Sequence, residues 1–181
     1  AKLRERCGVM PAVVPQVEQE VRWHSKFRSL YETNIYGLVN GNNLVVLDNA
    51  KVRSPFLARG VTAPTLDIQM QAVGKKCREY CLHVDEGEAY THAMATALNL
   101  PAVSNDNEAL KVLREQGKEA ACPTLRFFDL LVFARDCDWL DEATCESARS
   151  HLSAKKEYLP FAFRSKDSFA TARTAFVRRS P

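Results

Sequence analysis

The sequence predicts an α/β fold with a central parallel sheet. Two observations lead to this prediction: helical and strand patterns alternate along the chain, and the expected strands are short apolar runs. The chain has 181 residues, of which 46% are hydrophobic and 26% charged, so it is large enough for one domain with its own core. We expect this domain to span residues 1–164, followed by a basic tail at residues 165–181.

Local patterns predict the elements of the first half of the chain. A short helix is expected over residues 1–7. A long helix is expected over residues 15–31, because proline is well tolerated in a first helical turn. The β-branched apolar run at residues 44–47 is typical of a strand. Thr65 is a suitable N-cap for the next helix, which carries an apolar stripe at helical spacing.

The second half of the chain continues the alternation of helices and strands. Its expected elements, in order, are a helix over residues 85–98, a strand over 102–104, a helix over 107–116, a short strand near 120–122, a densely apolar and buried helix over 127–134, and a polar amphipathic helix over 141–152. The tail from residue 165 combines basic and aromatic side chains.

Composition narrows the classes of partner. No apolar run is long enough to span a membrane, and no export signal is visible, so we expect a cytoplasmic protein without a membrane partner. A net charge of +3 permits a nucleic-acid partner without demanding one. The cysteines are expected to be reduced thiols, because the chain can form a core without disulfides and lacks a second close pair of zinc ligands; they are Cys7, Cys77, Cys81, Cys122, Cys137 and Cys145.

The segment from residue 84 to residue 113 carries the strongest functional signal. Glu88 stands at the start of an alanine-rich helix, and Asp106 stands at the end of the strand that follows it. Ligands bind at the carboxyl ends of strands in open parallel α/β sheets, so we expect the two carboxylates to lie close together. Two acids without a Cys/His cluster favour Mg²⁺ or Mn²⁺ over zinc.

The same segment resembles the PIN-domain ribonucleases, in particular bacterial members with a GEAEAIALA-type helix. The matching segments are Gly87-Glu88-Ala89, Ala93-Met94-Ala95-Thr96-Ala97-Leu98, Asn99-Leu100-Pro101 and Ser104-Asn105-Asp106. Upstream, residues 13–21 are similar to the family's strand-to-helix element, in which Glu20 matches the acidic position. Downstream, Pro123-Thr124-Leu125 is similar to its GTLG-type segment.

The resemblance implies a three-layer α/β/α domain and a metal-dependent ribonuclease. Glu20, Glu88 and Asp106 would be the catalytic carboxylates and the ligands of Mg²⁺ or Mn²⁺. The family's first strand, which ends in a further Asp ligand, has no counterpart here and would lie before residue 1. Asp48 also ends an apolar strand, but its place in the chain order is wrong for that ligand.

RNA is the partner that the resemblance implies, and the phosphates would need basic groups around the acids. Arg22, Lys111 and Arg114 are the candidates for RNA binding. The resemblance also implies a toxin of a toxin–antitoxin pair, with an antitoxin-type protein partner, and a homodimer. Without the first Asp, we expect this chain to cleave single-stranded RNA poorly, and a version extended upstream by an Asp-ending strand to cleave it.

Each acid also has a purely structural interpretation. Glu88 would favour the dipole of its helix, Asp106 would be an N-cap, and Glu20 would be a solvated charge. These readings leave open a non-catalytic PIN-like binding or scaffold protein that has lost a metal ligand. A nucleotide-binding regulator is a third alternative, which no GxGxxG or GxxxxGK[ST] motif supports.

Overall fold

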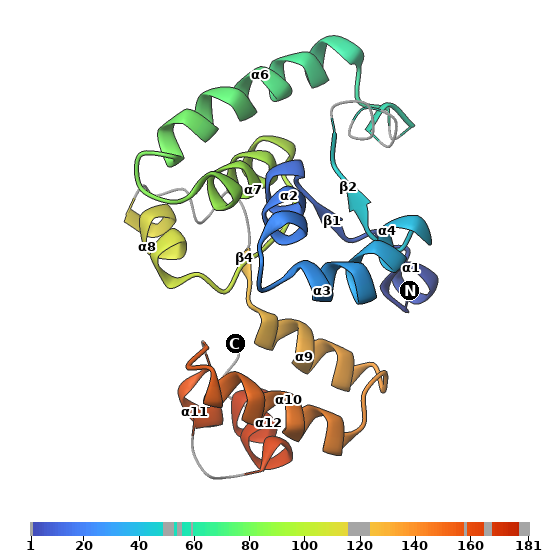
Figure 1. Ribbon diagram of the computed structural model, residues 1–181, viewed down its shortest axis with the longest axis vertical. Coiled ribbons are helices and arrows are strands. Elements are labelled where there is room, and N and C mark those ends of the chain that lie inside the picture. The colour runs from blue at the N-terminus through green and yellow to red at the C-terminus, as the bar shows by residue number, and fades with distance from the viewer. Residues whose placement is uncertain are drawn as a thin grey trace.

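The computed structural model describes residues 2–48, 53, 56–58, 60–115, 124–157, 159–164 and 168–177. The fold is mixed α/β, as the sequence predicts: it is mostly helical, with two small parallel sheets (Figure 1). In the described ranges the strands form two separate pairs rather than one continuous sheet.

The first strand pair joins β1 (Ala12–Val13) to β2 (Val45–Val46), with Ala12 opposite Val45. Helix α1 (Lys2–Cys7) precedes this pair. The chain between the two strands is helical and contains α2 (Pro15–Trp23), α3 (Arg28–Leu30), a π-helical turn (Tyr31–Ile35) and α4 (Tyr36–Asn40).

The predicted single helix over residues 15–31 is wrong in its second half. Helix α2 ends at Trp23, because His24 takes an extended conformation with φ −70° and ψ 124°. The chain then turns back, so that the buried Tyr31 donates a hydrogen bond from its hydroxyl to the carboxylate of Glu18 on α2. A straight helix would carry Tyr31 far from Glu18, since each residue adds 1.5 Å of rise.

Helices α6 (Ala63–Tyr80) and α7 (Glu86–Leu98) form the main helix pair. Thr62, rather than the predicted Thr65, caps α6: its Oγ1 accepts a hydrogen bond from the Thr65 backbone N at 3.4 Å. Proline 64 fits inside the first turn, where a backbone N–H has no helical partner. At the end of α7, Asn99 takes the left-handed conformation, with φ 53°, that commonly terminates a helix.

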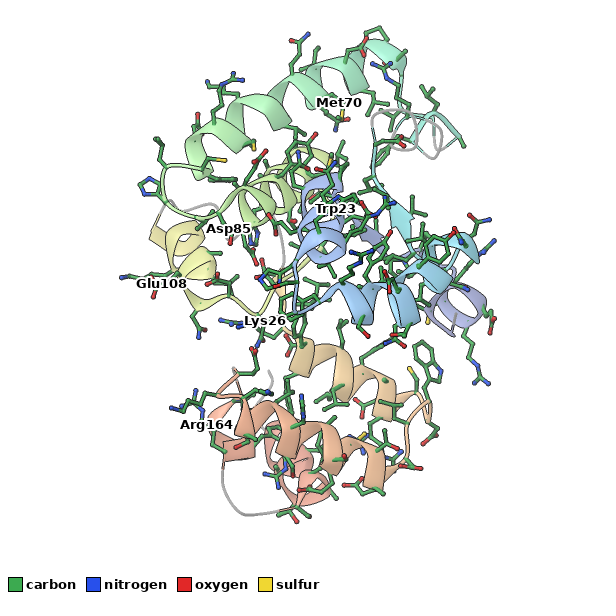
Figure 2. All side chains as sticks on the ribbon, in the orientation of Figure 1. Trp23, Lys26, Met70, Asp85, Glu108 and Arg164 are labelled. Atoms are coloured by element: carbon green, nitrogen blue, oxygen red, sulfur yellow. The ribbon has the colours of Figure 1, made fainter. Side chains whose placement is uncertain are left out.

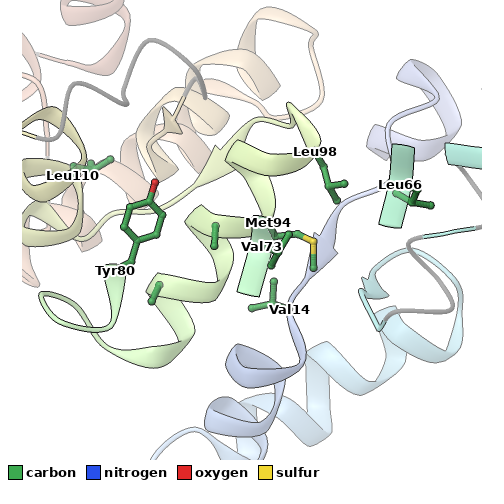
Figure 3. Packing of buried hydrophobic residues seen from close by; sticks show 9 residues of the cluster. Val14, Leu66, Val73, Tyr80, Met94, Leu98 and Leu110 are labelled. Carbon is green, nitrogen blue, oxygen red and sulfur yellow. The ribbon is translucent and has the colours of Figure 1, made fainter. Parts of the chain in front are cut away.

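The first hydrophobic core lies between α6 and α7 and reaches α8 and Val14, the residue between β1 and α2 (Figure 3). On α7 it contains the small residues Ala89 and Ala93, which are fully buried and let the two helices approach closely. The larger side chains around them are Val14, Leu66, Val73, Tyr80, Met94, Leu98 and Leu110. This core fixes the orientation of α7, which carries Glu88.

The second strand pair follows α7. Strand β3 (Ala102–Val103) pairs in parallel with β4 (Thr124–Leu125), and α8 (Asn107–Glu115) lies between them in the chain. The strand predicted near residues 120–122 falls outside the described residues. Asp106, one of the predicted site residues, lies in the connection between β3 and α8, directly before the first residue of α8.

The last four helices gather around a second core at one end of the molecule (Figure 1). They are α9 (Phe127–Asp136), α10 (Glu142–Ala154), α11 (Phe161–Arg164) and α12 (Phe169–Val177). Phe128, Phe163 and Phe169 are fully buried there, with ring centroids 4.2 to 6.0 Å apart. The predicted basic tail thus contributes α12 to a packed core, while the placement of a domain boundary at residue 165 stays a prediction.

Helix α9 is less buried than the prediction of a buried helix suggests. Phe128 and Val132 face the second core, but Phe127 and Phe133 are exposed. Across the described part of the chain, no helix combines the length and the apolar character that crossing a membrane requires.

Candidate carboxylate site

Glu88 lies in the first turn of α7, and two side chains hold its carboxylate. Oε1 accepts a hydrogen bond from Ser104 Oγ at 3.0 Å, and Oε2 lies 3.1 Å from His92 Nε2. Both partners are almost fully buried, whereas the Glu88 side chain keeps 24% of its exposure. Two buried side chains therefore orient the Glu88 carboxylate, while part of the Glu88 side chain remains exposed to solvent.

Asp106 follows β3 and caps α8. Its Oδ1 accepts hydrogen bonds from the backbone N–H groups of Glu108 at 2.7 Å and Ala109 at 3.3 Å, as the structural interpretation of this residue predicts. Its own backbone N–H donates to Ser104 Oγ at 3.1 Å. One buried hydroxyl thus contacts both the Glu88 carboxylate and the Asp106 backbone, and it brings together the two residues that the sequence singles out.

Glu20 reaches the same helix start from α2. A Cβ atom at Gly87 would lie 2.7 and 2.8 Å from the two Glu20 carboxylate oxygens, so the carboxylate rests directly against the glycine. Although Glu20 as a residue is exposed, this contact shields its carboxylate in part.

Burial raises the pKa of Glu20 above its ordinary value of 4.5, and the negative charge of Asp85 adds to this effect. Glu86 and Glu88 raise it further, while a hydrogen bond from the Gly87 backbone N–H acts in the opposite direction. Three further acids around the first turn of α7 therefore act on the Glu20 carboxylate. Asp85 and Glu108, which stand at the starts of α7 and α8, are labelled in Figure 2.

Sequence reasoning missed two contributors to this arrangement, Asp85 and Gly87. Asp85 is the N-cap of α7, accepting from the Glu88 backbone N at 2.9 Å. The pattern of an Asp followed three residues later by Glu is a helix-start signal that was available in the sequence. The role of Gly87 depends on a contact with a distant helix, which no local pattern reveals.

The donor chemistry of the site suits a hard cation, but the number of donors falls short. Carboxylate oxygens are the ligands that Mg²⁺ and Mn²⁺ prefer. Among the residues that the structure describes, no group of three or more His, Cys, Asp or Glu side chains is arranged to hold a metal ion. Glu20, Glu88 and Asp106 are thus neighbours of one region without forming a complete ligand set.

The predicted RNA-binding residues lie on α2 and α8. The Arg22 guanidinium lies 5.2 Å from the Trp23 ring centroid and 4.0 Å from Glu18, so its contacts are on α2 and toward the Tyr31 ring. Lys111 is exposed on α8. The side chain of Arg114 lies outside the described residues. Asp48 is exposed and follows β2 in the chain; this strand belongs to the β1–β2 pair rather than to the β3–β4 pair next to Asp106.

Comparisons with protein-family models, with curated proteins and with solved structures found no match for this chain. The resemblance to the PIN-domain ribonucleases therefore rests on the sequence motifs alone.

Proposed function

We propose that the chain is a metal-dependent ribonuclease of the PIN type, in which Glu20, Glu88 and Asp106 are the catalytic carboxylates and hold Mg²⁺ or Mn²⁺. The observation that carries the proposal is the Ser104 hydroxyl, which lies 3.0 Å from Glu88 Oε1 and 3.1 Å from the backbone N of Asp106. Two acids from different elements thus contact the same buried hydroxyl, and hydrogen bonds of this kind orient the side chains that bind metals.

The negative charges around Glu20 support the same proposal. The neighbouring negative charges that raise the pKa of Glu20 would be neutralised by a divalent cation at the start of α7. Glu20, Glu88 and Asp106 would hold such an ion, and the chemistry it would supply there is polarisation of a phosphoryl oxygen and activation of water. The protein's part is to hold the carboxylates: Ser104 and His92 fix Glu88, and the start of α8 fixes Asp106.

The remaining parts of the proposal follow from the resemblance. The two parallel strand pairs would belong to one three-layer α/β/α sheet. Arg22, Lys111 and Arg114 would bind RNA phosphates. The chain would act in the cytoplasm as a toxin paired with an antitoxin-type protein, and as a homodimer.

A non-catalytic binding protein is the second candidate, and two observations favour it. Both oxygens of Glu88 already contact protein side chains, and the described residues contain no three-ligand group. In that case Ser104, His92 and Glu88 form a structural network beneath a surface that binds RNA or protein without cutting.

Metal binding separates the two candidates. We expect Mn²⁺ to bind the 181-residue chain, measured by titration calorimetry, and Glu88→Gln or Asp106→Asn to weaken it at least tenfold. Asparagine is also a good N-cap, so Asp106→Asn leaves α8 intact. Glu108→Gln is the matched control, because Glu108 is an exposed acid in the first turn of the same helix. Equal Mn²⁺ affinity in all four proteins would exclude the carboxylate site.

A further inference from the structure

Two cysteines face each other in the last turn of α6. The sulfur atoms of Cys77 and Cys81 are 3.8 Å apart and share an S–H···S hydrogen bond. Cys81 is the C-cap residue, still helical with φ −59° and ψ −12°, and its backbone N–H donates to the Cys77 carbonyl at 2.9 Å. Residues four apart in a helix have Cα atoms roughly 6 Å apart, within the range of a disulfide, but Cβ atoms about 5–6 Å apart, which is longer than a disulfide allows. Closing the bridge therefore requires the backbone of this last turn to move.

The two thiols have different environments. Cys81 is exposed, while Cys77 is half-buried and packs against the first core. Burial raises the pKa of the Cys77 thiol to about 11, and the hydrogen bond to Cys81 is the next cause. Cys77 therefore keeps its proton, and Cys81 is the sulfur that an oxidant in solution reaches first.

We propose that Cys77 and Cys81 are a site of reversible covalent modification, at which hydrogen peroxide converts the two thiols into an intrahelical disulfide. The Cys81 thiolate attacks the peroxide, the O–O bond breaks, and Cys81 becomes a sulfenic acid while hydroxide leaves. The Cys77 sulfur then attacks the Cys81 sulfur and displaces the second hydroxide. Two thiols and one peroxide thus give one disulfide and two waters, with two electrons passing from sulfur to oxygen.

The second step is favoured by proximity. The Cys77 sulfur lies 3.8 Å from the Cys81 sulfur, so it is already beside its target. A dithiol such as dithiothreitol or thioredoxin restores the reduced pair by exchange.

The position of the pair gives the modification a structural consequence. Residues 81–85 connect the end of α6 to Asp85, the cap of α7. A bridge between Cys77 and Cys81 fixes the last turn of α6 immediately before this connection. The inference does not depend on the proposed ribonuclease activity, since it concerns only the two thiols and their helix.

Peptide mapping of the whole chain after peroxide treatment tests the site. Trypsin cuts after Lys76 and Arg78, so Cys77 and Cys81 end on different peptides unless a disulfide joins them. After one equivalent of peroxide, we expect a linked peptide pair that has lost two hydrogens, with four of the six thiols still titratable in denaturant. Dithiothreitol should separate the pair. Cys81 recovered only as sulfenic or sulfinic acid, or linked to Cys7 or to a second chain, would overturn the proposal.

Single variants identify the order of reaction. In Cys77→Ser, we expect Cys81 to be trapped as a sulfenic acid that dimedone labels. In Cys81→Ser, we expect Cys77 to remain a free thiol under the same treatment. Cys7→Ser is the matched control, since Cys7 is also an exposed thiol, on α1, and its loss should leave the linked pair unchanged. Equal labelling of Cys77 and Cys81 when either is present alone would contradict the assigned roles.

Discussion

The α6–α7 core and the α9–α12 core bury apolar surface in different ways. The first core uses fully buried alanines on α7, with Ala89 and Ala93 at the contact to α6. The second core is aromatic, with Phe128, Phe163 and Phe169 packed ring against ring. Small side chains allow close helix approach, whereas aromatic rings bury more area per residue and dominate core energetics.

Polar side chains also have different roles in the two regions. In the first region, His92 on α7 and Ser104 after β3 contact the carboxylate of Glu88, a side chain that stays partly exposed to solvent. In the second core, Arg149 and Glu146 hold the backbone of α11 and α12 through the Phe163 carbonyl and the Phe169 N–H. One region therefore uses its polar groups to present a carboxylate, and the other uses them to join helices.

The largest expected effect is on RNA cleavage, because the proposed catalytic carboxylates all lie in the first region. In a version that carries an apolar strand ending in Asp ahead of residue 1, we expect Mg²⁺- or Mn²⁺-dependent cleavage of single-stranded RNA, and Asp106→Asn should abolish it. Asp138→Asn is the control in the second region, because Asp138 has φ 54° and asparagine tolerates that conformation. Cleavage of a fluorescent RNA measures both. An Asp106→Asn protein as fast as its parent would sink the carboxylate-site hypothesis.

Stability should separate the two cores next. Phe128→Ala removes a fully buried ring and should cost about 3–5 kcal/mol of unfolding free energy. Ala93→Gly, in the first core, should cost only about 1 kcal/mol, mainly through helix propensity. Urea unfolding followed by circular dichroism measures both changes. Similar costs would show that the aromatic core carries no larger share of stability.

A smaller effect is expected from the charge of Glu20. The pKa of Glu20 is raised above 4.5 in the folded chain. Protonated Glu20 therefore adds to the free energy of unfolding below pH 4.5, and this contribution is lost as the pH rises through the folded pKa. Glu20→Gln removes this loss and should raise the melting temperature slightly at pH 7, with little difference near pH 4. Calorimetric melting at the two pH values tests this. A variant that is less stable at pH 7 than the parent would show that hydrogen bonding outweighs repulsion.

The smallest effect is expected from Gly87→Ala. The new methyl group would meet the Glu20 carboxylate at 2.7 Å, but the carboxylate is the end of a flexible side chain and swings away. The gain in helix propensity should offset the lost hydrogen bond, so the net stability changes by less than about 1 kcal/mol. The pH dependence of melting should then resemble that of Glu20→Gln. Retention of the parent's pH dependence would mean that Glu20 does not rest on Gly87.

Local sequence signals predicted most elements but not how distant ones meet. Helix α7 and strand β3 were predicted nearly to the residue, because an alanine-rich run and the segment Asn99-Leu100-Pro101 mark their boundaries. The break after Trp23 was not predicted, because it depends on the contact of Tyr31 with Glu18 rather than on a helix breaker.

The candidate site divides in the same way. Glu88 and Asp106 were found from their places at a helix start and a strand end, whereas the hydrogen bond from Ser104 to the Glu88 carboxylate was not predicted. The contact between the Glu20 carboxylate and Gly87 could not be predicted from the sequence, because the two residues lie on helices far apart in the chain. The three metal ligands were predicted from the resemblance and stay a prediction; the described residues contain no group of three or more His, Cys, Asp or Glu side chains that could hold a metal ion.

The parallel pairing of the strands bears on the order in which the chain folds. Ala12 pairs opposite Val45, and Ala102 opposite Thr124, so each ladder closes a long loop before its few hydrogen bonds form. Parallel strands require such crossovers, and non-local pairing is slow. Helices α6 and α7, joined by only a few residues, form their contacts locally. We therefore expect this helix pair to be the folding nucleus, and the strand amides to acquire protection from hydrogen exchange last.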